Sequence, residues 1–279
     1  MNKTTTQLLS IEQLRPFQGH PFKVIDNEEM NQLTESILTQ GLLTPLVVRP
    51  LENGTYEVIS GHRRLYACKK AGIEMVPALI VEMDRDAAAI ALVDSNLHRE
   101  HILPSEKAFA YKLKMDAIKH QGLTCGQVGH KSRDTLSEGE SVGESARQVQ
   151  RYIRLTHLIP GILQMVDDSK IALTPAVEIS YLTNREQREL LETMECEDCT
   201  PSLSQAIQLK QLSQSGNLDI YTVFDILTQR KPNQQDKISF RTDDVRKFFP
   251  KSYTTAQMQD VILRLLEGYQ RQRQRSQER

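Results

Sequence analysis

The sequence SGHRRLYACKKAG, residues 60–72, begins an α-helix in an unusual way. The alternating strand pattern TYEVIS ends directly before Gly61, and His62, Arg63 and Arg64 then fall in the first helical turn. The helix dipole places partial positive charge at that end, so each cation there is unfavourable by roughly 0.3–1 kcal/mol. A bound anion reverses this, because free backbone N–H groups and guanidiniums both attract phosphate. The pattern therefore predicts a strand, a tight turn and a helix that together hold an anion.

A second stretch, SNLHREHILPSEK at residues 95–107, carries related chemistry. It supplies an amide (Asn96), a guanidinium (Arg99) and a carboxylate (Glu100), and residues three apart on a helix share a face. Such a set can hold a phosphate and a metal together. A solvated helix end is the alternative for this stretch, and surface arginines that cover a neighbouring carboxylate are the alternative for the first.

The remaining pattern up to about Arg99 predicts a small mixed α/β domain. Strands are expected at residues 46–50, 55–60 and 76–83, and helices at 26–40, 62–71 and 84–97. Asp26 is the expected cap of the first helix, and Glu29 completes a capping box.

Beyond residue 103 the strand signal ends, and the pattern predicts helices. These include residues 104–122 and 144–155, separated by a glycine-rich polar stretch. We therefore expect an α+β chain with domains at residues 1–102, 103–212 and 218–279.

Composition restricts the class of protein. The net charge of −1 argues against a general polyanion binder, although arginines concentrate at residues 147–154 and 271–279. No signal peptide or membrane span is expected, so the predicted location is the cytoplasm. Cys196 and Cys199 form a single CxxC with acidic neighbours, which is typical of ordinary thiols.

The chain resembles the ParB/RepB type of DNA-partition protein between about residues 11 and 191. The resemblance rests on EEMNQLTESILTQGLLTPLVVRP, YEVISGHRRLYACKKAGIEMVPALIV and SNLHREHILPSEKAFAYK. It implies a nucleotide-binding N-domain related to sulfiredoxin, a helix-turn-helix domain and a C-terminal dimerisation segment. Members of that family bind CTP and Mg²⁺, load at a specific DNA site and close as a sliding clamp.

Carried onto this chain, the resemblance implies contacts to the nucleotide from three segments. The GLLTP loop corresponds to the cytosine side, and GHRR and SNLHRE correspond to the phosphate motifs. The implied contact residues are Gly41, Thr44, Pro45, Gly61, His62, Arg63, Arg64, Asn96, Arg99 and Glu100, with Asn96 also as the metal ligand. His62 and Ser95 stand where the family typically has glutamates, which weakens a Mg²⁺ site. At most a slow CTPase is therefore expected.

The segment ESARQVQRYIRL, residues 144–155, is the predicted DNA-recognition helix. Ala146, Val149 and Ile153 form its inward face, while arginine and glutamine are the residues that contact base edges in the major groove. The predicted DNA-binding residues are Ser145, Arg147, Gln148, Gln150, Arg151 and Arg154. A plain amphipathic helix with a solvated basic face is the alternative.

The expected partners are a centromere-like site in double-stranded DNA, a second copy of the chain and a ParA-type ATPase. Two other functions remain open at this point. One is a nucleoid-associated or transcriptional regulator that uses the same helix-turn-helix without partition. The other is a small-molecule kinase or related enzyme on the ParB/sulfiredoxin scaffold, although the sulfiredoxin cysteine is missing beside Gly61 and the nearest thiol is Cys68.

Overall fold

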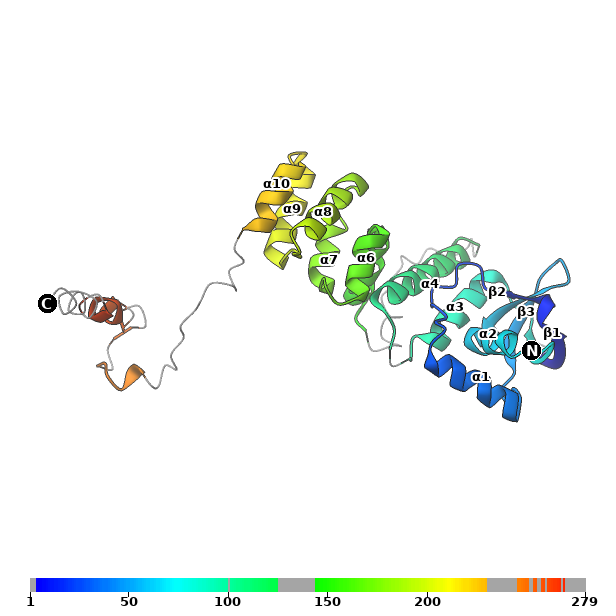
Figure 1. Ribbon diagram of the computed structural model, residues 1–279. Helices are drawn as coiled ribbons and strands as arrows, with labels where there is room; N and C mark the ends of the chain where they lie inside the picture. The colour runs from blue at the N-terminus through cyan, green and yellow to red at the C-terminus, as the bar shows by residue number, and fades with distance from the viewer. Residues whose placement is uncertain are drawn as a thin grey trace. The chain divides into compact units, whose positions relative to one another are not determined.

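The computed structural model of the chain describes residues 4–99, 101–124 and 144–229, and, near the C-terminus, 245–250, 253–254, 257–258, 260–266 and 268. The chain divides into two units, Met1–Gln229 and Arg230–Arg279 (Figure 1). None of the described helices is both long enough and apolar enough to cross a bilayer.

The N-terminal part of the first unit is built on a five-stranded sheet with the order β1-β5-β3-β4-β2. Its strands are β1 (Thr4–Ser10), β2 (Leu14–Pro16), β3 (Leu46–Pro50), β4 (Tyr56–Ser60) and β5 (Met75–Val81). β1 is antiparallel to β5 and β3 is antiparallel to β4, while β3 with β5 and β2 with β4 are parallel. Because successive strand residues point to opposite faces, the β4 neighbours Val58 and Ile59 enter two different cores.

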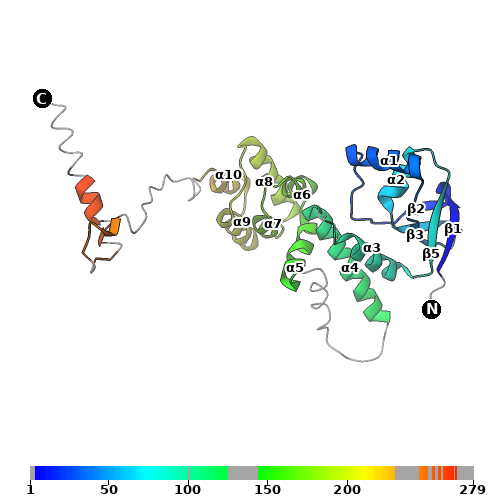
Figure 2. The same cartoon turned by 90° about the horizontal axis from the view of Figure 1, so that it is seen from below.

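Helices cover both faces of this sheet. α1 (Glu28–Gln40) and α2 (His62–Lys70) lie side by side and bury Met30 and Leu65 with Val58 (Figure 2). α3 (Arg85–Asn96) buries Leu92 with Ile59 in the other core. Packing against the sheet therefore fixes the positions of the N-terminal ends of α1 and α2 and of the C-terminal end of α3.

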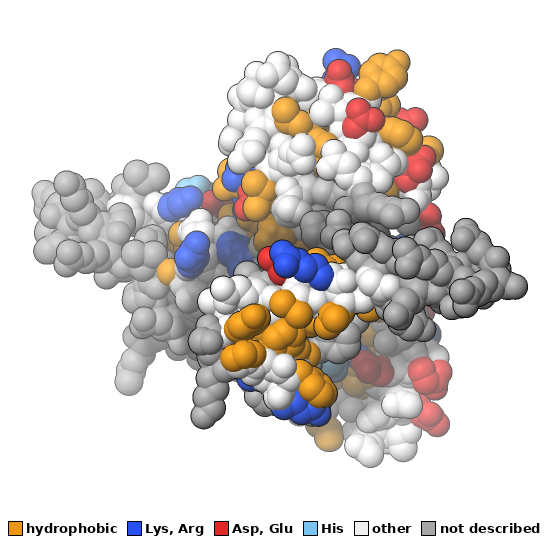
Figure 3. Space-filling model, turned by 90° about the vertical axis from the view of Figure 1, so that its left-hand side faces the viewer, with side chains coloured by type: hydrophobic (Ala, Val, Ile, Leu, Met, Phe, Trp, Pro, Cys, Tyr) orange, Lys and Arg blue, Asp and Glu red, His pale blue; other side chains and the backbone are white. Residues whose placement is uncertain are grey.

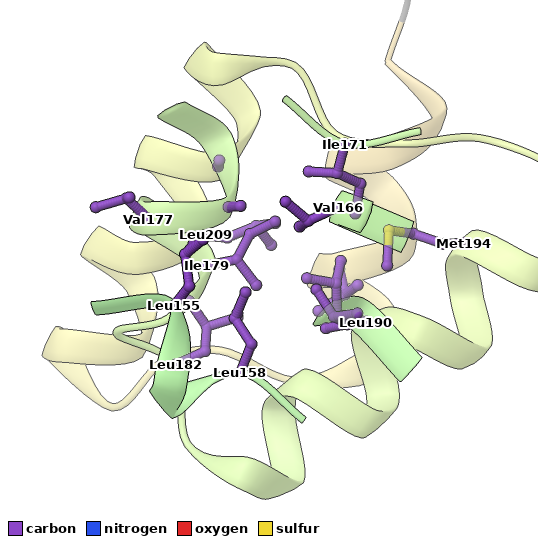
Figure 4. Close-up of a cluster of buried hydrophobic side chains, with 14 of the residues drawn as sticks. Leu155, Leu158, Val166, Ile171, Val177, Ile179, Leu182, Leu190, Met194 and Leu209 are labelled. Atoms are coloured by element: carbon purple, nitrogen blue, oxygen red, sulfur yellow. The ribbon is translucent and has the colours of Figure 1, made fainter. Parts of the chain in front are cut away.

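The rest of the first unit is helical. Its elements are α4 (Pro104–Thr124), α5 (Ala146–Arg154), α6 (Pro160–Asp167), α7 (Leu173–Ile179), α8 (Asn184–Cys196), α9 (Leu203–Ser215) and α10 (Ile220–Thr228). Fully buried side chains such as Leu155, Ile179, Leu190 and Leu209 form their common core (Figure 4). Ala108 of α4 belongs to this core, whereas other α4 residues pack against α3, so α4 joins the two regions.

The predicted fold class is confirmed in its main feature, a mixed sheet-containing region followed by helices. The strands predicted at residues 46–50, 55–60 and 76–83 match β3, β4 and β5 within two residues, but β1 and β2 were not predicted. The domain boundaries stay predictions. α10 lies within the predicted segment 218–279, and its side chains Val223 and Ile226 pack in the helical core.

The predicted cap of α1 is wrong. Asn27, not Asp26, caps the helix, because its Oδ1 accepts from the Met30 N–H at 3.1 Å. The Asp26 carboxylate instead accepts from Lys70 Nζ at 2.6 Å, across to α2. Lys70 of α2 thus binds the Asp26 carboxylate that the sequence pattern had assigned to the N-cap of α1.

We predict that Gly61→Ala lowers the free energy of unfolding by about 1–2 kcal/mol more than Gly54→Ala. Both glycines have positive φ, +105° and +76°, but an added Cβ at Gly61 would lie 2.6 Å from Cδ2 of Leu46, while Gly54 has open space. Leu46 is fully buried, so a shift of its side chain would disturb the packing of the core. Urea unfolding of the two variants gives the difference, and equal losses would contradict the importance of this contact.

Candidate functional site

A cavity of about 580 Å³ opens at the head of α2. It unites the two stretches that the sequence singled out, residues 61–64 and residues 95–99. The side chains and backbone that line it belong to Glu29, Gln32, Leu33, Ser60, Gly61, His62, Arg63, Arg64, Ser95, Asn96 and Arg99. The cavity therefore lies between the start of α2, the end of α3 and the first turns of α1.

α2 begins at this cavity with Gly61 as its N-cap in the left-handed conformation. Within the described part of the chain, no side chain caps this helix. The first N–H engaged inside the helix is that of Leu65, which donates to the Gly61 carbonyl at 2.8 Å. The N–H groups of residues 62–64 have no intrahelical acceptor, as at any helix start. Together with the helix dipole they favour an anion at this position.

Arg63 and Arg99 bring two guanidiniums to the cavity from different elements. Arg63 Nη2 donates to Glu29 Oε2 at 3.0 Å, and both side chains are well exposed. The Arg99 Cζ lies 5.7 Å from the ring centre of Phe22. Partial burial lowers the pKa of the Arg99 guanidinium, and the positive charge of Arg63 lowers it further. The two cations repel each other, so an anion between them would be stabilised by both.

Arg64 does not point freely into the cavity. Its Nη1 donates to the backbone carbonyls of Thr44 and Pro45, at 2.6 and 2.9 Å. Gly41, Thr44 and Pro45 do not line the cavity, and Arg64 connects their loop to it. The predicted contacts of these three residues with a nucleotide stay predictions, and Arg64 holds the loop in place.

His62 lines the cavity, and its ring packs against the segment that precedes α1. Its ring lies on that of His20, with centroids 3.7 Å apart, and its Nε2 accepts from the Phe17 N–H at 3.4 Å. Burial is the main cause that lowers the pKa of His62 to about 3, and the neighbouring His20 and Arg99 contribute to the same shift. His62 is therefore neutral near pH 7 and contributes no charge to the cavity.

The end of α3 contributes an amide. Asn96 is only 7% exposed, and its Nδ2 donates to the Leu92 carbonyl at 2.7 Å and to Ser95 Oγ at 3.2 Å. Its Oδ1 accepts from none of the residues that the structure describes. Glu100, the remaining predicted contact, lies outside the described residues.

The described residues around the cavity supply few carboxylates for Mg²⁺. In the described parts of the chain, no three His, Cys, Asp or Glu side chains gather where they could hold a metal ion. Among the described residues that line the cavity, Glu29 is the one carboxylate, and Arg63 pairs with it. Protein sites for Mg²⁺ use one or two carboxylates beside substrate phosphates, so the described donors do not fit this ion.

Sequence reasoning missed part of the lining. Glu29, Gln32 and Leu33 come from one face of α1, at the spacing of successive helical turns. His20, which lies against His62, precedes α1 in an irregular segment. A carboxylate one residue beyond a helix start resembles an ordinary capping residue, so no local signal distinguishes Glu29.

Cys68 is buried in α2 against the core beneath the cavity. Burial raises the pKa of its thiol. A buried neutral thiol is a poor nucleophile, which weighs against sulfiredoxin-type chemistry.

α5 presents the predicted DNA-binding residues on two different sides. Ser145 caps the helix, since its Oγ accepts from the Gln148 N–H at 3.3 Å. Val149 is buried, as predicted. Arg147 and Gln150 are exposed and form no hydrogen bond or ion pair with any described residue. Both side chains are therefore available to a ligand, as far as the described residues go.

Other basic residues of α5 hold the helix to its neighbours. Arg151 donates to Gln148 Oε1 at 3.2 Å and to the Thr174 hydroxyl at the start of α7. Arg154 donates to the Ser180 carbonyl at 2.9 Å, and its Cζ lies 3.9 Å from the ring centre of Tyr181. Arg154 thus has a structural role. The glycine-rich stretch before α5, residues 125–143, and the arginine-rich residues 271–279 lie outside the described residues.

Glu144 connects the start of α5 to α4. Its carboxylate accepts from Lys107 Nζ at 2.7 Å and from the Tyr111 hydroxyl at 3.0 Å. The residue therefore fixes where α5 begins relative to α4.

Hydrophobic side chains gather on the face of the molecule that Figure 3 shows. In the described residues of the C-terminal unit, the large exposed apolar side chains are Phe248, Leu263, Leu265 and Leu266. Three of these lie in the helical residues 260–266. A short helix that exposes three leucines has apolar surface left to bury against another surface.

Comparison with known proteins gives consistent matches. Residues 1–97 match the model of the ParB N-terminal domain. The chain is 30% identical over 245 residues to the probable chromosome-partitioning protein ParB of Vibrio cholerae, which covers 86% of this chain and 83% of that protein. It is 30% identical over 191 residues to stage 0 sporulation protein J of Bacillus subtilis, covering 68% of this chain and 63% of that protein, or less than two thirds of its length. Among solved structures, C-terminally truncated ParB of Caulobacter crescentus complexed with CTP-γ-S aligns with a TM-score of 0.32 and 23% identity, over 68% of this chain and 99% of that one.

We predict that His62 makes the folded protein less stable in mild acid. The unfolded chain protonates this histidine near pH 6.5 and the folded protein only near pH 3, so the unfolded state binds more protons between these values. The contribution is complete above pH 6.5 and is lost as the pH falls towards 3. Between pH 7 and pH 5 the wild type should lose about 1–2 kcal/mol more than His62→Gln. Urea unfolding at both pH values measures this loss, and equal pH dependence in the two proteins would exclude a buried neutral His62.

Proposed function

The chain belongs to the ParB family, and from this premise we propose that it is a DNA-partition protein that binds CTP at the head of α2 and a specific double-stranded DNA site through α5. As such a protein it acts as a dimer in the cytoplasm, on the nucleoid, where nucleotide binding closes it around DNA as a clamp. The observation that carries the proposal is the single cavity that unites residues 61–64 with residues 95–99.

The geometry of the cavity suits a triphosphate. On one side, the free N–H groups at the start of α2 can donate hydrogen bonds to phosphate oxygens. The guanidiniums of Arg63 and Arg99 face the same space and can donate forked hydrogen bonds to phosphate. Arg64 holds the carbonyls of Thr44 and Pro45, so the loop expected beside the cytosine is tied to the phosphate end of the site.

The same site interacts with α4, and this interaction links nucleotide binding to closure of the clamp. Arg99 lies between α3 and α4, and the charge of Glu106 in the first turn of α4 acts on it. A phosphate that binds Arg99 weakens the attraction between Arg99 and Glu106, because Arg99 is then drawn towards α2. The position of α4 in turn affects α5, through the contacts of Glu144 with Lys107 and Tyr111.

Little hydrolysis is expected. His62 is neutral and Ser95 donates to the Leu92 carbonyl at 2.9 Å, so neither supplies the carboxylate that the family typically has. A role for the nucleotide as a switch, with at most slow CTPase activity, agrees with this donor set.

Two further partners follow from the family. The exposed leucines at residues 263, 265 and 266 favour pairing of the C-terminal unit with a second copy. A ParA-type ATPase is the expected protein partner in partition.

We predict that CTP converts the protein from a site-bound to a sliding form. On closed DNA that carries the cognate site, CTP should increase the number of molecules retained, whereas ATP and GTP should not. Arg63→Ala and Arg99→Ala should each lose this effect, because they remove direct phosphate donors. Calorimetric titration and retention on end-blocked DNA are the measurements, with Arg188→Ala on α8 as the charge-matched control. Unchanged retention in the two cavity variants would refute the proposal.

We also predict that Arg147 contacts DNA and Arg154 does not. Arg147→Ala should weaken cognate binding by about 1–3 kcal/mol without changing the free energy of unfolding. Arg154→Ala should instead destabilise the fold by about 1–3 kcal/mol, since the carbonyl of Ser180 loses its donor. Fluorescence anisotropy with cognate and scrambled duplexes, beside urea unfolding, separates these effects. If Arg147→Ala leaves cognate binding intact, the recognition element lies elsewhere.

A further inference from the structure

The cavity at the head of α2 has an unusual balance of charge for a triphosphate site. Its guanidiniums come from Arg63, Arg64 and Arg99, against the single carboxylate of Glu29 among the described lining residues. That carboxylate is engaged with Arg63 at 3.0 Å. The arginine side chains thus supply the positive charge in the cavity.

Two of the described residues that line the cavity, His62 and Ser95, bring neutral groups to it. The ring of His62 is held between His20 and the Phe17 N–H. The hydroxyl of Ser95 donates to the Leu92 carbonyl and accepts from Asn96. Glu106, a buried carboxylate in the first turn of α4, accepts from the N–H groups of Lys23 and Leu103, and it does not line the cavity.

The free oxygen Asn96 Oδ1 is uncharged. A hard ion such as Mg²⁺ keeps most of its water unless charged oxygens replace it, so one amide oxygen gives little affinity. Bound to a nucleotide, Mg²⁺ also cancels part of the phosphate charge. This cancellation weakens the attraction between the phosphates and the guanidiniums.

We infer that this cavity binds the triphosphate of a nucleotide without a divalent cation, and that Arg63, Arg99 and the free N–H groups of α2 take the place of the ion. The inference rests on the proposed nucleotide site and concerns how that site neutralises its ligand.

The test is calorimetric titration of the full-length protein with CTP, in excess EDTA and in millimolar Mg²⁺. The affinity in EDTA should be equal to that in Mg²⁺ within about threefold, or tighter. Ser95→Glu should weaken binding in EDTA and make Mg²⁺ tighten it by about tenfold or more, since it adds a carboxylate beside Asn96. Ser95→Ala, which adds no charge, should keep the affinities in EDTA and in Mg²⁺ within about threefold of each other, whatever its effect on the absolute affinity. Ser95 is exposed, so these variants should fold, as thermal unfolding can verify.

The outcomes separate the two proposals. A loss of tenfold or more in EDTA for the wild type would overturn the cation-free site and leave the nucleotide site standing. A Mg²⁺ response that Glu100→Gln abolishes would overturn it as well and assign the ion to Glu100. Absence of CTP binding in both buffers would refute the nucleotide site itself and the inference with it.

Discussion

The site depends on one tight backbone turn, at which β4 ends and α2 begins. Gly61 adopts a φ of +105°, and the space where its Cβ would be is taken by the side chain of Leu46 on β3. Because no side chain fits there, the start of α2 lies close against the sheet, and its N–H groups face the cavity. The cations that follow Gly61 are unfavourable for an isolated helix, but they are well placed for an anion.

Polar contacts join the segment that precedes α1 to the helical region. Asp167 at the end of α6 has a side chain only 3% exposed, and it accepts from the N–H and the hydroxyl of Ser105, at 2.9 and 2.6 Å. Lys23 lies 3.6 Å from the same carboxylate, and its N–H donates to Glu106 at 2.7 Å. These contacts join the segment that precedes α1 to the start of α4 and the end of α6.

The parts of the fold that the sequence predicted are those determined by local pattern. β3, β4 and the N-cap Asp84 of α3 follow from alternation, turns and capping chemistry within a few residues. β1 was missed because TTTQLLS lacks clear alternation, and this edge strand is defined by its pairing with β5. The same limit applies to side chains: the sequence indicated arginines at residues 64 and 154 as ligand contacts, while tertiary neighbours engage both. Glu29 and His20 belong to the site through contacts that no spacing in the sequence reveals.

We propose that phosphate oxygens bind at the N-terminal end of α2. Backbone amide hydrogen exchange of residues 62–64, with and without CTP, tests this binding most directly, because these N–H groups have no acceptor within the helix. We expect CTP to protect these amides, and Arg99→Ala to reduce the protection along with the affinity. Saturating CTP that leaves their exchange unchanged, while it protects amides elsewhere in the chain, would contradict it.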